Sequence, residues 1–259
     1  MRIRLPFLLF ACLAVLDLRT GAQQIAPLAL QLLQASLVAQ TGQVTVQDVT
    51  LSGTVQYVAG SDDETVPITL QAIAAGSARS GVSLAAGALT ETRQLKSTGP
   101  SGSWSNGNGV SHSMVGHNLM TDAAWFFPLF IVQRLLSDPN AVVSYLGNGG
   151  GTLHLQAVKA TPSNLSGIAA TQLQHLSQID LYLDAASFEP VGLGFNIHPD
   201  NNALIDIPVY IQFSNYQQTN GVSVPMHIQK YVNSTLALDI QVQDAVFNTG
   251  LSQSSFAAQ

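Results

Sequence analysis

The last third of the chain, residues 207–256, alternates apolar and polar side chains in three successive stretches. This two-residue period is typical of strands that are buried on one face only. Asn220–Gly221 and Asn233–Ser234 separate the stretches, and these residue types tolerate the positive φ angles of tight turns. The pattern therefore predicts an antiparallel meander with one apolar and one polar face. The apolar face must either be covered by other parts of the chain or bind a ligand.

The chain before this meander supplies further strands and a covering helix. The spacing of leucines between Pro27 and Gly42 predicts a helix that begins at the proline and ends at the glycine. Residues 99–109 predict a strand that enters a turn, and residues 163–176 a polar helix or loop. Alternating stretches bounded by turn residues predict strands at 49–57, 66–73, 82–86, 90–95, 142–146, 153–158, 179–183 and 190–195. The sequence thus indicates an α+β protein built on an antiparallel sheet.

The most apolar segment after residue 22 runs from Asp122 to Val132, and the helical structure that we expect there ends near Leu136. Thr121 could cap a helix there, but Pro128 forbids one straight helix through the segment. We therefore expect a turn of helix, a kink and a second helical piece. The segment is too short to span a bilayer. Its aromatic side chains either fill the core over the sheet or line an apolar cavity, and the sequence leaves both interpretations open.

The first 22 residues have the pattern of an export signal. Arg2 and Arg4 precede an apolar stretch, and small residues at 20–22 offer a cleavage site. We therefore expect an exported protein of the periplasm or cell envelope. In an alternative interpretation, residues 9–12 form a lipobox and Cys12 carries a lipid. Ordinary cleavage removes this cysteine, the only one in the chain, and with it any disulfide or thiol nucleophile.

The rest of the chain is acidic and poor in charge. Without the first 22 residues it keeps six basic and fourteen acidic side chains, a net charge of about −8. The basic residues are scattered singly, so we expect no nucleic-acid partner. Charged residues make up 9% of the sequence, where about a quarter is typical. Amides and hydroxyls therefore provide most of the polar surface.

No motif in the sequence indicates catalysis. The six histidines are widely separated: His112, His117, His154, His175, His198 and His227. His112, His117 and Asp122 are the nearest to a metal-ligand spacing, but this spacing is not specific. The sequence contains no Gly-x-Ser-x-Gly elbow and no phosphate-binding glycine loop. We expect no enzyme, no cofactor and no metal, and a hydrolase would require a histidine, a carboxylate and a serine to converge in space.

A family resemblance rests on the closing segment of the chain. Residues 213–225, Asn233, the last alternating strand, residues 246–248 and Phe256 resemble the closing pattern of the periplasmic lipoprotein carriers, the LolA-like and LolB-like proteins. In that superfamily a curved antiparallel sheet, a half-barrel, shelters acyl chains between its concave face and covering helices. The resemblance implies one half-barrel domain over residues 23–259, after a signal peptide at 1–22. The carriers' pocket arginine matches no position here, which leaves a lipoprotein cargo in doubt.

The expected function is to bind or carry a hydrophobic or acylated ligand, a lipid or a lipoprotein, in the half-barrel. Acyl chains bind through apolar area, at about 25 cal/mol per Å² removed from water. The expected ligand-binding residues come from the aromatic segment and the final meander: Trp125, Phe126, Phe127, Leu129, Phe130, Phe213, Met226 and Ile228. Envelope proteins are the other expected partners, and no transmembrane span is expected in the mature chain. The alternative is a structural or interaction protein of the envelope whose core is filled.

Overall fold

A computed structural model of the chain describes residues 24–42, 44–96 and 98–257. The expected signal peptide and Cys12 lie outside the described residues. Fourteen strands form one sheet in the order β1-β8-β9-β10-β11-β12-β13-β14-β2-β3-β4-β5-β6-β7. All neighbours are antiparallel except β1, which is parallel to β8.

The strands of the sheet are β1 (Gln24–Ile25), β2 (Asp48–Ala59), β3 (Asp62–Ile73), β4 (Ser77–Leu84), β5 (Gly87–Lys96), β6 (Gly99–Ser105), β7 (Ser111–Ser113), β8 (Ala141–Gly149), β9 (Thr152–Lys159), β10 (Ile179–Asp184), β11 (Pro190–Ile197), β12 (Ile207–Thr219), β13 (Val222–Val232) and β14 (Thr235–Phe247). The helices are α1 (Pro27–Thr41), α2 (Pro128–Ser137) and α3 (Gly167–Ser177), with short 3-10 turns η1 (Gly116–Leu119) and η2 (Gln253–Phe256). The predicted strands are confirmed, and the two-residue strand β1 and the three-residue strand β7 are additions.

The final meander forms as its alternation predicts. Strands β12, β13 and β14 are joined by two tight turns, at Asn220–Gly221 and Asn233–Ser234. All four turn residues have positive φ, from 50° at Asn233 to 82° at Gly221. Such turns match the right-handed twist of the paired strands. The register that they set places the apolar side chains of all three strands on one face, as in the pairs Phe213–Ile228 and Ile228–Ile240.

Helix α1 begins and ends where the sequence predicts. Pro27 occupies the first turn, where a backbone N–H has no partner within the helix, so the proline costs no hydrogen bond. Gly42 ends the helix at a φ of 55°. The helix contacts α2, β8 and β13. Among the described residues, none of the helices is both long and apolar enough to cross a membrane.

The aromatic segment differs from its predicted form in one respect. Residues 123–126 form a turn that is not helical, and Pro128 is the first residue of α2. The proline therefore starts a helix and introduces no kink. Thr121 does not cap the helix, because α2 begins only at Pro128 and Phe127 occupies the cap position; the Thr121 hydroxyl accepts a hydrogen bond from Arg93 instead. Asp122 fixes the turn instead, since its carboxylate accepts a hydrogen bond from the Ala124 N–H at 2.9 Å.

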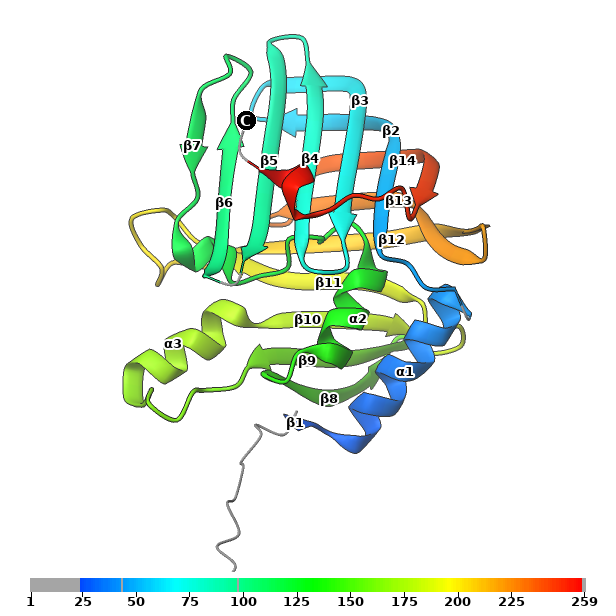
Figure 1. Cartoon of the computed structure of the whole chain (residues 1–259), viewed down its shortest axis with the longest axis vertical. Helices are drawn as coiled ribbons and strands as arrows, with labels where there is room; N and C mark the ends of the chain where they lie inside the picture. The colour runs from blue at the N-terminus through cyan, green and yellow to red at the C-terminus, as the bar shows by residue number, and fades with distance from the viewer. Residues whose placement is uncertain (1–23, 43, 97, 258–259) are drawn as a thin grey trace, which may run out of the picture.

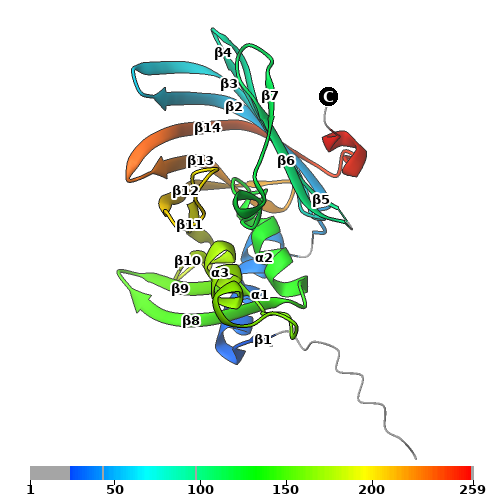
Figure 2. The same ribbon diagram turned by 90° about the vertical axis from the view of Figure 1, so that its left-hand side faces the viewer.

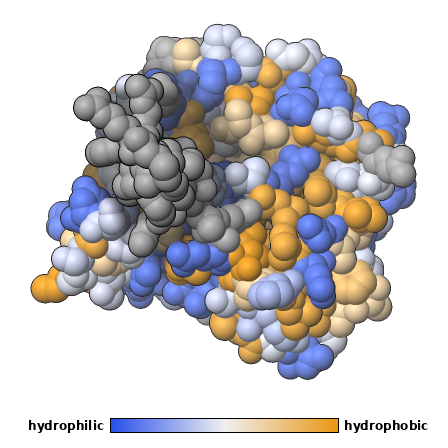
Figure 3. All heavy atoms as spheres, turned by 60° about the horizontal axis from the view of Figure 1, so that its bottom comes forward, coloured by the Kyte–Doolittle hydropathy of each residue, from blue (hydrophilic) through white to orange (hydrophobic). Residues whose placement is uncertain are grey.

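The sheet curls around helices α1 and α2, which lie on its concave side (Figures 1 and 2). The final turn η2 packs on the outer face of β4 and β5, where Phe256 is buried. Figure 3 shows the end of the molecule that carries β1, β8 and α1, where apolar side chains gather in bands between polar ones. Leu28 and Val38 of α1 and Leu146 of β8 are among the exposed large apolar side chains.

Candidate functional site: a cavity on the concave face

An apolar cavity of about 330 Å³ lies against the concave face of β2–β5, β13 and β14. Its lining is mostly apolar and includes Ile68, Val82, Leu89, Leu238 and two tryptophans, Trp104 and Trp125. Part of the wall is buried, with Trp125 and Ile68 each 3% exposed, whereas Trp104, the cross-strand partner of Glu91 on β6, is 38% exposed. The cavity therefore has both a buried wall and a wall that reaches the surface.

The eight side chains that the sequence predicts as ligand contacts lie in different surroundings. Trp125 lines the cavity. Phe127 and Phe130 pack edge to face, with ring centroids 4.9 Å apart, inside the core beneath α2. The other members of the predicted set are buried in the same core, apart from Met226, which is half-buried against it: Phe126, Leu129, Phe213, Met226 and Ile228. Both interpretations of the aromatic segment thus describe part of it, since one end faces the cavity and the rest fills the core.

Three charged side chains converge at the inner end of the cavity. The Glu91 carboxylate and the Lys230 ammonium belong to the cavity lining, and Arg93 lies two residues along β5 from Glu91. Arg93 Nε donates to Glu91 Oε1 at 2.7 Å. Lys230 Nζ lies over the ring of Trp125, 4.5 Å from its centroid. Sequence reasoning missed this cluster, because its members stand on β5 and β13, which are far apart in the sequence.

Burial and neighbouring charges shift the pKa values of Lys230 and Glu91. Burial lowers the pKa of Lys230, and the positive charge of Arg93 lowers it further, while the Glu91 carboxylate opposes both effects. Burial would raise the pKa of Glu91, but the charges of Arg93 and Lys230 outweigh it and hold this pKa below its usual range. Glu91 therefore stays ionised and paired with Arg93.

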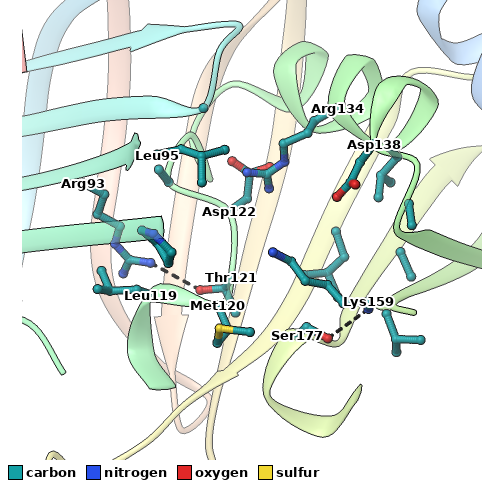
Figure 4. A pocket seen from close by; sticks show the side chains of 18 of the residues that line it. Arg93, Leu95, Leu119, Met120, Thr121, Asp122, Arg134, Asp138, Lys159 and Ser177 are labelled. Carbon is teal, nitrogen blue, oxygen red and sulfur yellow. Dashed lines mark hydrogen bonds and ion pairs between the residues drawn. The ribbon is translucent and has the colours of Figure 1, made fainter. Parts of the chain in front are cut away.

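A smaller and more polar pocket of about 90 Å³ is lined by residues 119–123, which lead into the turn at Trp125 (Figure 4). Arg93 also lines it, and its guanidinium donates to Thr121 Oγ1 at 3.3 Å and to the Asn118 carbonyl at 3.1 Å. Arg134 of α2 pairs with the buried Asp122. These bonds tie the loop before α2 to β5 and to α2, and so hold Trp125 in place against the cavity.

The histidines do not assemble as the nearest sequence spacing suggests. His112 stacks on Trp104, and His117 forms a hydrogen bond with the Pro199 carbonyl. Asp122 forms an ion pair with Arg134. A different set comes together instead: His175, His198 and Asp206 each offer one ligand atom, and these atoms lie within 4.8 Å of one another. Two imidazoles and a carboxylate are donors that zinc accepts. This group could hold a divalent metal, and its long sequence separations hide it from motif searches.

One serine, one histidine and one carboxylate also converge on the outer face of the sheet. His227 Nδ1 lies 3.1 Å from Ser214 Oγ, and its Nε2 lies 2.8 Å from Asp239 Oδ1. Two glutamines complete the partners of this aspartate, Gln229 at 2.7 Å and Gln241 at 3.0 Å. The three groups sit side by side on β12, β13 and β14, and none of them lines the two cavities above.

The same arrangement recurs on β9 and β10 without a serine. Asp180 accepts hydrogen bonds from His154 at 2.7 Å, from Gln156 at 3.2 Å and from Gln178 at 3.0 Å. In each copy one histidine and two glutamines on neighbouring positions satisfy a half-buried strand carboxylate. A repeated ladder of this kind indicates cross-strand stabilisation of the polar face, and it explains the Ser214–His227–Asp239 contact without catalysis.

Comparisons with known proteins bear on the fold. No protein-family model and no curated protein matches the sequence. Solved structures do match: a Vibrio parahaemolyticus protein described as an outer membrane lipoprotein-sorting domain is 13% identical, with a TM-score of 0.50 over 88% of this chain and 95% of its own. The chain therefore shares the fold of this solved structure, a curved antiparallel sheet with covering helices. This confirms the half-barrel that the closing segment predicts.

Two further structures are similar over comparable lengths. A DUF1329 family protein from Desulfovibrio piger is 11% identical, with a TM-score of 0.53 over 88% of this chain and 95% of its own. A LolA superfamily protein from Nitrosomonas europaea is 8% identical, with a TM-score of 0.49 over 88% of this chain and 96% of its own. At these identities the likeness concerns the fold, and the site must be interpreted from its own residues.

Proposed function

We propose that this protein is an exported carrier that holds a hydrophobic, single-chain ligand in the cavity over Trp125. The observation that carries the proposal is the cavity itself, an apolar hollow of about 330 Å³ in the concave face. Ligand sites in proteins typically span about 300–1,000 Å³ and are lined mainly by apolar and aromatic side chains with few polar groups. The cavity meets both conditions.

The size of the hollow limits what it can hold. Its volume is at the lower end of that range, so it suits one acyl chain or a ligand of similar bulk better than an anchor with several chains. Removing a chain from water contributes about 25 cal/mol per Å² of apolar area, and this requires few hydrogen bonds. The half-exposed side at Trp104 offers the route by which such a ligand enters and leaves.

Export and domain organisation belong to the same proposal. Residues 1–22 would act as a signal peptide, and residues 23–259 would form one half-barrel domain outside the cytoplasm. The fold supports this, because one of its structural neighbours is described as an outer membrane lipoprotein-sorting domain. The donor and acceptor of the ligand would be other components of the envelope.

A pair of matched substitutions on β4 tests the proposal. Ser80 lines the cavity, whereas Ser83 is exposed and points to the opposite face of the same strand. With delipidated protein, the uncharged fluorescent probe N-phenyl-1-naphthylamine should bind saturably to the wild type and to Ser83→Trp. Ser80→Trp fills the cavity and should weaken binding by at least tenfold. Absence of saturable binding to the wild type would overturn the carrier proposal and favour a structural protein of the envelope.

A further inference from the structure

We infer that the cavity selects anionic amphiphiles and binds their acidic headgroup at Lys230, an inference that rests on the proposed function. The ligand class is an acyl or alkyl chain that ends in a carboxylate or a phosphate. The charged group lies at Lys230 and the chain lies along the apolar part of the lining. The inference starts from the charge balance at the inner end.

The charges there leave one cation in excess. Arg93 and Glu91 neutralise one another through their 2.7 Å ion pair. Among the described residues, no carboxylate oxygen lies within 4.0 Å of Lys230 Nζ and no hydrogen bond to it is formed, so its close partner is the face of Trp125. Lys230 is half-buried in a mostly apolar lining that also holds Glu91. A partly buried cation is costly unless it is paired, and an aromatic face and a carboxylate already paired with Arg93 compensate only a part of that cost.

An anionic headgroup provides the missing partner. A carboxylate or phosphate oxygen at Lys230 accepts a charge-assisted hydrogen bond, which is stronger than one between neutral groups. The guanidinium of Arg93 cannot replace the lysine, since it is held by Glu91, by the Asn118 carbonyl and by Thr121. Lys230 is therefore the group in the lining that can discriminate an acid from a neutral molecule with the same chain.

The position of the lysine sets the orientation of the ligand. Lys230 lies over Trp125, which is 3% exposed, and the rest of the lining is mostly apolar, with Val82 and Leu89 in it. An amphiphile bound in the reverse direction would leave its charge against apolar side chains and its apolar end against an ammonium. The headgroup-inward orientation satisfies both ends of the molecule.

Matched ligands test the inference on the full mature chain. Dodecanoate, dodecyl phosphate and dodecanol share one chain and differ only in the headgroup, and each can displace N-phenyl-1-naphthylamine below its micellar concentration. At pH 7.5 the wild type should bind at least one of the two anions tenfold or more tightly than dodecanol. The anion that binds better identifies a carboxylate or a phosphate as the preferred headgroup.

Two lysine substitutions separate the headgroup site from a general charge effect. Lys230→Met should reduce the preference for the anion to less than threefold and keep dodecanol binding, because methionine preserves the apolar stem. Lys96→Met, on the exposed end of β5, should leave the preference unchanged. Equal binding of the acid and the alcohol by the wild type, or a preference that survives in Lys230→Met, would overturn the inference and leave the carrier proposal intact. Failure of every ligand and of the probe would overturn both.

Discussion

The concave face of the sheet meets two different surroundings. Near β8, the sheet packs against α1 and α2, and side chains such as Phe127 and Ile131 are completely buried. We call this the filled region. Along β2–β5, β13 and β14, the same face borders the cavity, which we call the hollow region. One aromatic segment serves both regions, since Trp125 faces the cavity while its C-terminal neighbours fill the core.

This difference teaches that a single apolar face can be both a core and a binding surface. Alternation along the strands is the same in both regions, so the strand pattern does not decide which part is filled. The placement of the helices decides it. The following predictions compare the two regions, from the largest expected effect to the smallest.

The largest effect should follow from a cavity made in the filled region. Phe127 is fully buried and packs against Phe130, so Phe127→Ala should lower the free energy of unfolding by about 3–5 kcal/mol. Leu89→Ala in the hollow region should cost about 1 kcal/mol, because this side chain is half-buried and already borders empty space. Urea unfolding of both variants measures the contrast. Equal losses would show that the two regions do not differ in packing.

The second-largest loss of stability should follow from breaking the ion pair between Arg134 and Asp122. Arg134→Met leaves the carboxylate of Asp122, which is 4% exposed, without its partner. We expect a loss of about 2 kcal/mol, less than for a fully buried pair, since the arginine is itself partly exposed. The same loop holds Trp125, so the fluorescence of this tryptophan should shift toward that of a solvated indole. An unchanged stability would mean that the loop is held by packing alone.

The pH dependence of binding sharpens the interpretation of the hollow region. Lys230 is charged below its pKa, and burial lowers this pKa from the ordinary value of 10.5. The preference for an anionic amphiphile should therefore be present at neutral pH and disappear as the pH rises, before an ordinary lysine would titrate. Displacement titrations with dodecanoate measure it, and dodecanol serves as the control without a charge. A preference that grows with pH would contradict the role of Lys230.

The smallest effects should be equal in both regions, because they concern the outer face. Asp180 and Asp239 are each held by one histidine and two glutamines, so Asp180→Asn and Asp239→Asn should each lower the free energy of unfolding by about 1 kcal/mol.

Burial would raise the pKa of Asp239, but hydrogen bonds from Gln229 and His227 outweigh it and lower this pKa. The stabilisation is thus present above the ordinary aspartate pKa and is lost as the pH falls through the lowered value. Unfolding curves at pH 7 and pH 3 test this, and unequal costs would show that the two ladders differ.

The sequence predicted the strands and the first helix well, because their signals are local. Alternation, a proline at a helix start and Asn-Gly turns each act over a few residues, and Gly42 and Asn220 behave as predicted. The predicted kink at Pro128 was wrong, because a proline can either kink a helix or begin one, and here it begins α2. The choice depends on the turn that Asp122 stabilises.

The site was accessible from the sequence only in part. The apolar character of the segment at Trp125 indicated a cavity or a core, but not where one ends and the other begins. The charged group at the inner end was not predictable, because four strands separate β13 from β5 in the sheet, and Glu91 and Lys230 meet only across its curved concave face. Sequence spacing carries no information about such a pairing.

A crystal structure of the mature chain with dodecanoate tests the central claim most directly. The account predicts electron density for the chain between β2–β5 and β13–β14, with the carboxylate within hydrogen-bonding distance of Lys230 Nζ and the chain against the apolar lining. A hollow region occupied entirely by the protein's own side chains, in crystals grown with excess ligand, would contradict it.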